Sequence, residues 1–391
     1  MKNLESRGLL LIGLLLTLAG PAWPEAPSSY DAEIARLEGQ IAEAAAAPVG
    51  LESATKHAFF TYRKATLTGD YGDYRAAETA IGSAITAVGP SEDLLFLEAS
   101  FQFKLHRLER AREVLARMGD RKDEPRMRAF AADLAYQEGR YAEAGEGYRA
   151  VLRRERRWDN LARLAYFESR TGRPGEADRL YLEAQDLLTI KEMRSWAWLE
   201  LQRGLLDLDF GRPAKALEHY RRAEEGYSGW WLIEEHIAEA LGQLGRREEA
   251  IGFYRRILEK NRSPEFLSAL AALLEDRDPA AAAELNREAL AAFEQQSALY
   301  PEAALGHYLE HRLDRGSAEA SLLEMARRNV ALRPGGEARL LLARAYVKMG
   351  ERELAKAELA TIEATPWRMP ELKELRAELR RTRQPAPKAA K

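Results

Sequence analysis

Two histidines and a glutamate lie close together in the stretch His307-Tyr308-Leu309-Glu310-His311. On a helix, residues four positions apart share a face, so both imidazoles could bind one zinc ion. Glu310 would then lie near a metal-bound water. The spacing matches the H-x-x-E-H motif of inverted zinc peptidases letter for letter. A zinc-dependent peptidase is therefore one alternative function, and the other interpretation is a charged helix that carries two of the six histidines by chance.

The remaining candidates for chemistry are weaker. The chain has no cysteine to serve as a nucleophile or a further metal ligand. His236 and Glu239 follow Glu234-Glu235, and we interpret this run as a solvated helix face rather than a metal site. The sequence contains no G-x-S-x-G, the motif that positions a nucleophilic serine in hydrolases. It also contains no G-x-x-x-x-G-K-[ST], the loop motif that binds nucleotide phosphates. We therefore predict a protein that is not an enzyme, with no catalytic residue, no bound metal and no cofactor.

A repeat organises the elements that carry these residues. Gly139-Arg140 is followed by Ala144, Tyr148 and Val151, which share one face of a helix. The same pattern follows Gly172, Gly211 and Gly245, at steps of 33, 39 and 34 residues. A small residue also recurs seven positions before each turn. A small residue on each of two helices lets their backbones approach closely, and the aromatic fills the space toward the next unit.

This pattern resembles the tetratricopeptide repeat, whose small, small and aromatic positions correspond here to Ala132, Ala144 and Tyr148. Leu270 and Tyr308 depart from it, because they occupy the first small position. The resemblance covers about four-fifths of the chain. It implies an all-α, right-handed superhelical solenoid of about nine helix–turn–helix units over residues 51–363, with N- and C-terminal capping helices. The N-terminal cap is expected within 23–50, after a flexible leader, and the C-terminal cap within 364–383.

The two ends of the chain carry other signals. Lys2 and Arg7 precede the apolar run from Gly8 to Gly20, and small residues then suit cleavage after Ala22. Residues 1–22 are thus predicted to be a signal peptide, which places the protein in the periplasm or outside the cell. An uncleaved N-terminal anchor is the alternative, and after cleavage no membrane span is expected. Residues 384–391 alternate proline, alanine and lysine and are predicted to be disordered.

The charge balance and the repeat together suggest the class of partner. With 59 basic and 62 acidic residues, the chain has no excess positive charge for nucleic acid. The resemblance implies a scaffold that binds proteins or extended peptides through its concave face, in association with an envelope complex. Counting along the leading helices predicts that the concave face carries Phe96, Ser100, Phe103, Asp133, Tyr136, Tyr166 and Arg170. Glu235 and Glu239 are expected to follow on this face.

A cluster of aromatic residues leaves one more function open. Trp196, Trp198, Tyr227, Trp230 and Trp231 lie close together in the sequence. Tryptophans often anchor partners at interfaces, so the cluster could bind glycan or cell-wall material. In stacked helical units they more often fill the core, and we favour that interpretation.

Overall fold

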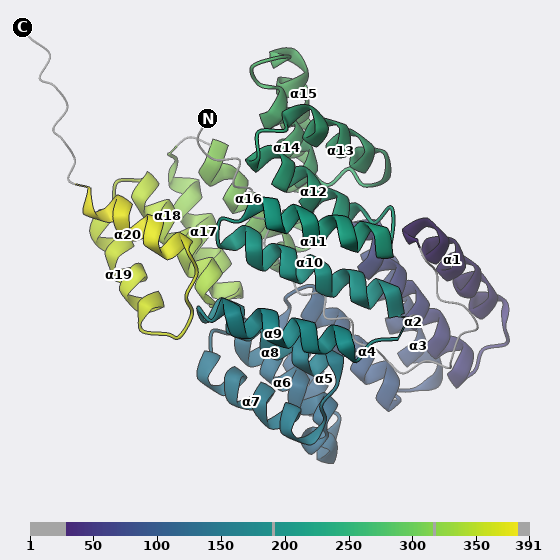
Figure 1. Ribbon diagram of the computed structural model, residues 1–391. Helices are drawn as coiled ribbons and strands as arrows, with labels where there is room; N and C mark the ends of the chain where they lie inside the picture. Colours follow the sequence, from purple (N-terminus) through teal and green to yellow (C-terminus); the bar gives the residue numbers. More distant parts are fainter. Residues whose placement is uncertain (1–28, 190–191, 316–317, 382–391) are drawn as a thin grey trace, which may run out of the picture.

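The computed structural model describes residues 29–189, 192–315 and 318–381. The predicted signal peptide at 1–22, the leader up to residue 28 and the predicted tail at 384–391 lie outside the described residues. The described part holds twenty α-helices and one short 3-10 helix, η1 (Gly119–Asp123), and no β-strand. The prediction of an all-α repeat solenoid is confirmed (Figure 1).

Eighteen of the helices form nine consecutive pairs, each packed on its neighbour in sequence. In chain order the pairs are α2 (Leu51–Thr68) with α3 (Tyr71–Val88), α4 (Glu92–Lys104) with α5 (Leu108–Ala116), α6 (Pro125–Gln137) with α7 (Tyr141–Arg154), α8 (Trp158–Arg170) with α9 (Pro174–Asp186), α10 (Met193–Asp209) with α11 (Pro213–Gly226), α12 (Trp231–Gln243) with α13 (Arg247–Lys260), α14 (Pro264–Leu274) with α15 (Pro279–Leu299), α16 (Pro301–Arg315) with α17 (Ala320–Leu332), and α18 (Gly336–Lys348) with α19 (Arg352–Glu363). The helix α1 (Tyr30–Ala46) precedes the array and α20 (Glu371–Arg380) follows it.

The repeated small and aromatic residues form the contact between the two helices of a unit. Ala132, Ala144 and Tyr148 are all buried. In a later unit the approach is closer, since a Cβ on Gly204 would lie 2.2 Å from Cε1 of Tyr220. Such contacts explain why the first position must be small where the aromatic of the trailing helix crosses it.

The unit formed by α16 and α17 accommodates a large residue at this position. The ring of Tyr308 stacks on Phe293 of α15, with ring centroids 5.7 Å apart and planes 12° from parallel. Leu270, the other departure, is buried within α14. Both large residues therefore pack inside the array.

Most turns between paired helices use a glycine in the left-handed region. Gly139, Gly172, Gly211 and Gly245 have φ between +72° and +79°. At the corresponding turn after α4 the residue is His106, with φ of +55°. Left-handed backbone is unfavourable for a residue with a Cβ, so this turn is held by its surroundings.

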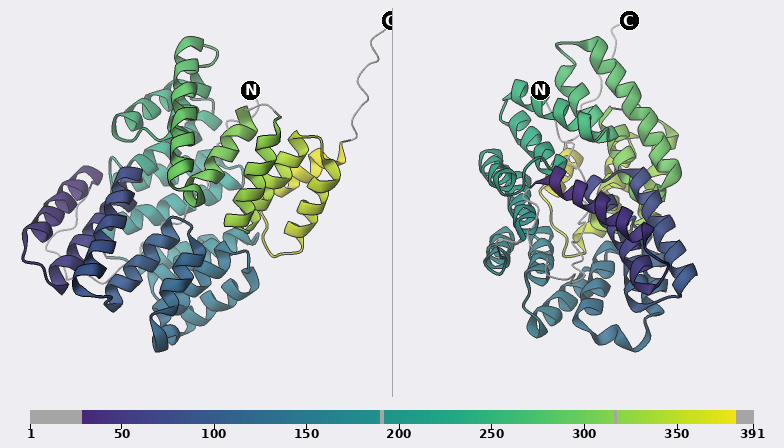
Figure 2. Two further views of the ribbon diagram at one scale, coloured as in Figure 1. Left: turned by 180° about the vertical axis from the view of Figure 1, so that it is seen from behind. Right: turned by 90° about the vertical axis from the view of Figure 1, so that its right-hand side faces the viewer.

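The solenoid closes on itself, so units far apart in sequence lie side by side. Trp231 Nε1 on α12 donates a hydrogen bond to the carbonyl of Leu67 on α2 at 3.0 Å. The backbone N–H of Tyr30 donates to the carbonyl of Ser228 at 2.9 Å, which attaches α1 to the turn between α11 and α12. The right-hand view of Figure 2 shows α1 lying across the N-terminal and central helices.

The C-terminal units close the other side of the array. Arg368 N–H donates to the carbonyl of Arg170 at 2.8 Å, and Gly336 N–H donates to the Tyr141 hydroxyl at 2.6 Å. The Tyr300 hydroxyl donates to Glu78 at 3.2 Å. The yellow C-terminal helices therefore lie beside α8 and α9 in Figure 1. The inner surface of the solenoid is thereby enclosed.

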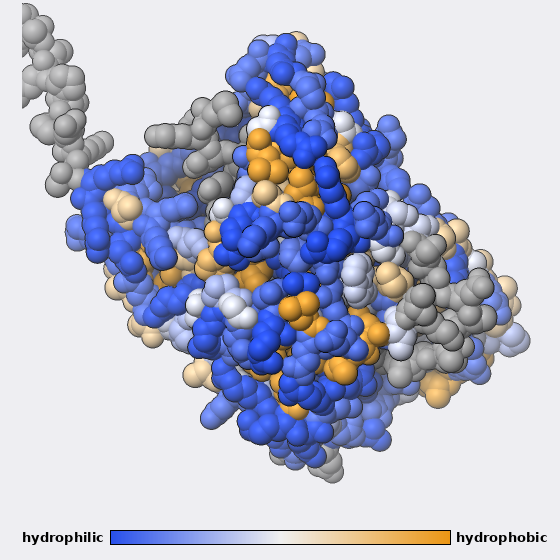
Figure 3. Space-filling model, in the orientation of Figure 1, coloured by the Kyte–Doolittle hydropathy of each residue, from blue (hydrophilic) through white to orange (hydrophobic). Residues whose placement is uncertain are grey.

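The outer surface is mainly polar. Figure 3 shows one face on which hydrophilic residues predominate and the hydrophobic patches are small and separated. Within the described residues, no helix combines the length and the apolar character that crossing a bilayer requires.

Candidate functional site

A cavity of about 270 Å³ lies on the inner side of the closed solenoid. The helices that line it are α6, α8, α10, α12, α16, α18 and α20, and none of the trailing helices of the pairs contributes. Leading helices thus form the inner surface, as the repeat pattern predicted. We call this space the central cavity.

Carboxylates predominate among the charged residues that line the central cavity. The eight acidic residues are Asp209, Glu239, Glu310, Asp314, Glu337, Glu371, Glu374 and Glu378, and the three arginines are Arg170, Arg333 and Arg344. His106 and His236 also face the cavity. A partly enclosed space with one sign of charge in excess attracts the opposite charge, so the lining favours groups that carry positive charge.

Two of the three lining arginines are neutralised by lining carboxylates. Arg170 pairs with Asp209 at 3.1 Å and its guanidinium lies over the Tyr166 ring. Arg344 pairs with Asp314 at 2.7 Å. Both arginines therefore contribute to the wall of the cavity rather than offering a free charge.

Arg333 differs from the other two. It is only 6% exposed, yet within the described part of the chain it makes no side-chain ion pair or hydrogen bond. Its guanidinium lies against Gly306, where a Cβ would approach Nη2 to 2.5 Å. Burial lowers its pKa, and the nearby Glu337 opposes this effect. The Arg333 guanidinium therefore lies at the cavity wall without an ion pair from the described chain, an arrangement that is costly for a buried cation.

His106 lies near Arg333 and is also unsatisfied. It is buried, and neither ring nitrogen has a hydrogen-bond partner. Burial and the positive charges of Arg333 and Lys104 lower its pKa, so the imidazole is neutral at pH 7. Its left-handed backbone places this side chain in the cavity wall at a turn where other units have glycine. Strain and unpaired polar atoms at one place are features of a binding site.

The H-x-x-E-H residues do not converge on one point. His311 Nδ1 lies 3.1 Å from Ser268 Oγ, and His307 Nδ1 lies 3.7 Å from Glu265, both on α14. Glu310 lines the central cavity, 3.9 Å from Arg344, and burial raises its pKa to about 8. The motif residues do not appear among groups of three described side chains that could share a metal ion. The geometry therefore gives the peptidase alternative no support.

The run from Glu234 to Glu239 is buried, so its interpretation as a solvated helix face is wrong. The inner surface is shielded by the closure of the array, which the repeat pattern does not reveal. Burial opposes the charged form of His236, but Glu235, Glu239 and Asp209 raise its pKa. Burial raises the pKa of Glu235 to about 7, with Glu239 adding to the effect.

The seven residues predicted for the concave face are separated by the structure into two groups. Tyr166 and Arg170 line the central cavity. The other five, Phe96, Ser100, Phe103, Asp133 and Tyr136, are buried between helices. Binding of a partner by these five residues stays a prediction, and in this conformation they present no open surface.

Each of the five has a partner within the fold. Phe96 and Phe103 both contact the Phe130 ring, with centroids 5.7 and 5.3 Å apart, and the Ser100 hydroxyl donates to the carbonyl of Phe96 at 2.6 Å. The Tyr136 ring contacts Tyr166 at 5.4 Å. Asp133 accepts hydrogen bonds from Tyr148 and Arg163. The aromatic contacts and the Arg163 bond join consecutive units, whereas the Ser100 and Tyr148 bonds lie within one unit.

The aromatic cluster belongs to the core. Trp198, Tyr227 and Trp230 are buried, and Tyr227 packs edge-on against Trp230. Trp196 and Trp231 are half-buried, and Trp231 is held by Leu67 as described above. The core interpretation therefore fits the structure, with Trp196 and Trp231 keeping part of their surface exposed.

Comparison with known proteins supports the fold. No family model matches the chain, and no curated protein matches it. The chain is similar to the solved structure of a Rap protein complexed with Competence and Sporulation Factor (TM-score 0.50, 15% identity, 84% of this chain and 99% of that one). It is also similar to a human IFIT1 dimer with PPP-AAAA (0.47, 14%, 85% and 94%) and to a tetratricopeptide repeat protein from Parabacteroides merdae (0.39, 17%, 65% and 98%). The helical-repeat fold predicted from the repeat residues is confirmed by the nine helix pairs and by the similar fold of the Rap structure.

Proposed function

We propose that this protein is an exported, non-enzymatic scaffold that binds an extended segment of a partner protein in its central cavity. Leading helices from several units supply the lining, so one segment can contact many of them at once. At about 270 Å³ the cavity is slightly smaller than the range of about 300–1,000 Å³ that is usual for small-ligand sites. It suits a chain terminus or a short stretch of side chains rather than a folded domain.

The observation that carries this proposal is the unpaired Arg333. A guanidinium in a cavity wall, 6% exposed and without an ion pair, lowers stability unless a bound anion compensates for it. A carboxylate can accept two parallel hydrogen bonds from a guanidinium, and His106 can contribute a further contact beside it. We therefore infer that Arg333 binds an acidic group of the partner segment. The excess of lining carboxylates favours a lysine or arginine elsewhere in the same segment.

The proposed location rests on the N-terminal sequence. A charged segment, a short apolar run and small residues before Ala22 are the features of a cleaved export signal. Protein recovered from the cell envelope should then begin at Trp23. A mature chain that retains Met1 to Ala22 would contradict cleavage and favour the anchored alternative.

Arg333→Gln should weaken binding of the selected segment at least tenfold, or about 1.4 kcal/mol, because the anion loses its charged partner. Peptides that bind the full chain would be selected from a library of short random sequences. Fluorescence anisotropy of one selected, labelled peptide would then give the dissociation constant. The stability of the variant should be unchanged or higher, since a buried unpaired charge is removed.

Arg328→Gln is the matched control, because Arg328 is an exposed arginine on α17, the helix that ends just before Arg333. It should bind the peptide as the wild type does. Equal affinity of the wild type and Arg333→Gln would contradict the role assigned to Arg333. Failure to select any peptide would contradict the proposed function itself.

A further inference from the structure

Three side chains on α12 have the arrangement of a metal site. His236 Nδ1 lies 3.1 Å from Glu235 Oε2 and 3.2 Å from Glu239 Oε2. Among the residues that the structure describes, they form the one group of three or more such side chains whose ligand atoms all lie within 4.8 Å of one another. Tetrahedral bonds of about 2.0–2.2 Å separate neighbouring ligand atoms by about 3.3–3.6 Å, close to the observed spacing.

The two carboxylates lack the partner that other buried carboxylates in this chain have. Eight acidic residues are buried in the described part, and six of them pair with an arginine, namely Glu33, Glu98, Asp133, Glu168, Glu200 and Glu234. Glu235 and Glu239 pair with no arginine or lysine and share only His236. They are the exceptions to a consistent pattern.

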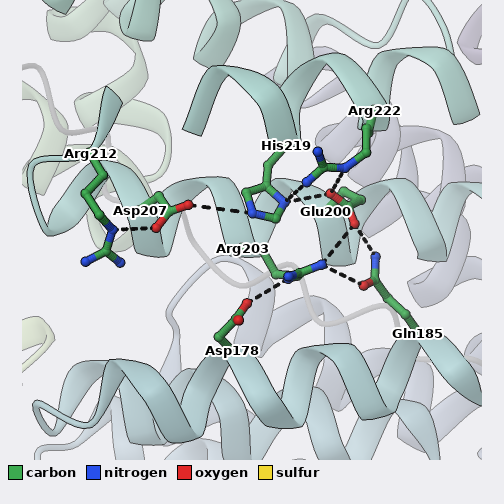
Figure 4. Close-up of polar contacts among 8 residues, drawn as sticks. All are labelled: Asp178, Gln185, Glu200, Arg203, Asp207, Arg212, His219 and Arg222. Carbon is green, nitrogen blue, oxygen red and sulfur yellow. Dashed lines mark hydrogen bonds and ion pairs between the residues drawn. The ribbon is translucent and has the colours of Figure 1, made fainter. Parts of the chain in front are cut away.

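Glu200 shows how the same chemistry is balanced elsewhere (Figure 4). Its carboxylate contacts His219 at 2.7 Å, Arg222 at 3.0 Å and Arg203 at 3.2 Å. Gln185 donates a further hydrogen bond at 2.8 Å. Burial opposes ionisation, but the bonds from His219 and Gln185 and the nearby positive charges lower the pKa of Glu200 to about 2. At this site the buried Glu200 carboxylate, which contacts the His219 imidazole, is therefore neutralised by neighbouring arginines.

The acidic side chains around the α12 cluster offer its carboxylates no counter-charge, because Asp209 is itself paired with Arg170 and Glu310, with a pKa raised to about 8 by burial, is largely protonated at pH 7. Asp209 on α10, Glu265 on α14 and Glu310 on α16 all lie near enough to act on its members electrostatically. Even a fully protonated imidazole would leave the two carboxylates with one uncompensated negative charge. That charge can be balanced by a proton on Glu235, whose pKa burial raises to about 7, or by a cation from outside the chain.

Two atoms of the cluster are also left without a partner. His236 is 2% exposed and Glu239 is 4% exposed, and both line the central cavity. Neither His236 Nε2 nor Glu239 Oε1 has a hydrogen-bond partner. Buried polar atoms are nearly always satisfied in native proteins, so the free Glu239 Oε1 indicates a missing ligand beside the cluster. His236 Nε2 lies on the side of the ring away from the two carboxylates and would need a separate partner.

We propose that Glu235, His236 and Glu239 bind one divalent first-row metal ion, Zn²⁺ or Mn²⁺, at the wall of the central cavity. Two carboxylates and a neutral imidazole carry two negative charges, which such an ion balances. The mixture of imidazole and carboxylate ligands suits these ions, and water can complete the coordination. The ligands all belong to α12, so the ion can bind without the peptide segment, although His236 and Glu239 line the cavity proposed for that segment.

Metal-free full-length protein, prepared by dialysis against EDTA, would be titrated with ZnCl₂ and, separately, with MnCl₂. Elemental analysis after desalting should find one ion per chain for at least one of the two metals, and the bound ion should raise the melting temperature. Glu239→Gln and His236→Gln should each weaken binding more than tenfold and abolish the rise in melting temperature. The Glu239→Gln change conserves side-chain shape, and circular dichroism would verify that the variants are folded.

The double variant His307→Gln/His311→Gln is the matched control, because it removes the two histidines of the H-x-x-E-H stretch on α16. It should bind metal as the wild type does. Absence of a stoichiometric ion in the wild type would overturn the proposal whatever the variants do. Full binding by Glu239→Gln, or loss of binding in the control alone, would also overturn it.

Discussion

Asp133→Ala should lower the free energy of unfolding by about 3 kcal/mol, because it leaves the Arg163 guanidinium buried with one of its partners missing. Asp133 on α6 accepts a hydrogen bond from the Tyr148 hydroxyl of α7 at 3.0 Å. It accepts another from Arg163 Nε of α8 at 3.1 Å, and both charged side chains are at most 5% exposed. The carboxylate therefore joins three helices of two consecutive units. Urea denaturation would measure the loss.

Asp178→Ala provides the comparison for this prediction. Asp178 also pairs with an arginine, Arg203, at 2.7 Å, but its side chain is 42% exposed. Exposed ion pairs contribute about 0–1 kcal/mol, so this variant should be nearly as stable as the wild type. If Asp133→Ala were as stable as Asp178→Ala, Asp133 would not be a structural residue. That result would favour a role for Asp133 in partner binding.

Glu33→Ala should release α1 from the closed array, with a loss of about 3 kcal/mol in its local stability. The Glu33 carboxylate contacts Arg63 of α2 at 2.9 Å and Arg194 of α10 at 3.5 Å. It also accepts a hydrogen bond from the Tyr227 hydroxyl at 2.8 Å. Removing the carboxylate would leave the Arg63 and Arg194 guanidinium groups close together, without their shared negative charge, where α1 contacts the array. Hydrogen exchange of the α1 amides would report the change.

The same contact has a defined pH dependence. Burial opposes ionisation of Glu33, but Arg194, Arg63 and Tyr227 together lower its pKa. Its contribution to stability is therefore complete above the pKa that Glu33 has in the unfolded chain, and it is lost as the pH falls through the lower pKa of the folded state.

Glu38→Ala on the same helix is the control for the Glu33→Ala experiment, since Glu38 is exposed and pairs only with Lys64. Its α1 amides should exchange as in the wild type, and a Glu33→Ala protein with the same exchange would refute the anchoring role.

The units of the solenoid could be predicted from the sequence because their contacts are local. Ala132, Ala144 and Tyr148 occur at fixed spacings, and each packs against a neighbour one helix away. Because each unit has the same contact between its two helices, the same small and aromatic residues recur in the sequence of each unit. The helix pairs, and the placement of leading helices on the inner surface, followed from it.

The closure could not be predicted in this way. The contact of Trp231 with Leu67 joins residues 164 positions apart, and nothing in either segment marks the other as its partner. Whether a solenoid closes depends on small rotations that accumulate from unit to unit. The tryptophan cluster could be assigned to the core but not to this long-range contact.

Closure also explains where the prediction of functional residues was incomplete. Phe96 and Phe103 lie on a leading helix, but they pack against Phe130 of the next unit instead of facing the cavity. Arg333 follows a trailing helix, so the prediction of inner-surface residues, which counted positions along the leading helices alone, did not include it. Its one signal in the sequence is its place before Pro334 and Gly335 in an irregular turn, which does not by itself indicate a site.

The central claim is that the solenoid is closed, and chemical crosslinking tests it most directly. Lys260 Nζ on α13 lies 3.2 Å from Asp31 on α1, although the two residues are 229 positions apart. A carbodiimide joins an amine and a carboxylate in contact through an amide bond and adds no spacer. Mass spectrometry of the digested monomer should therefore recover the Lys260–Asp31 peptide pair.

The local pair Lys56–Glu52, at 2.5 Å, serves as the positive control in the same digest. In the native monomer both crosslinks should form, and in urea the Lys260–Asp31 crosslink should disappear. Recovery of Lys56–Glu52 without Lys260–Asp31 from the native protein would show that α1 does not reach α13. That result would contradict the closure of the solenoid between its N-terminal and central units.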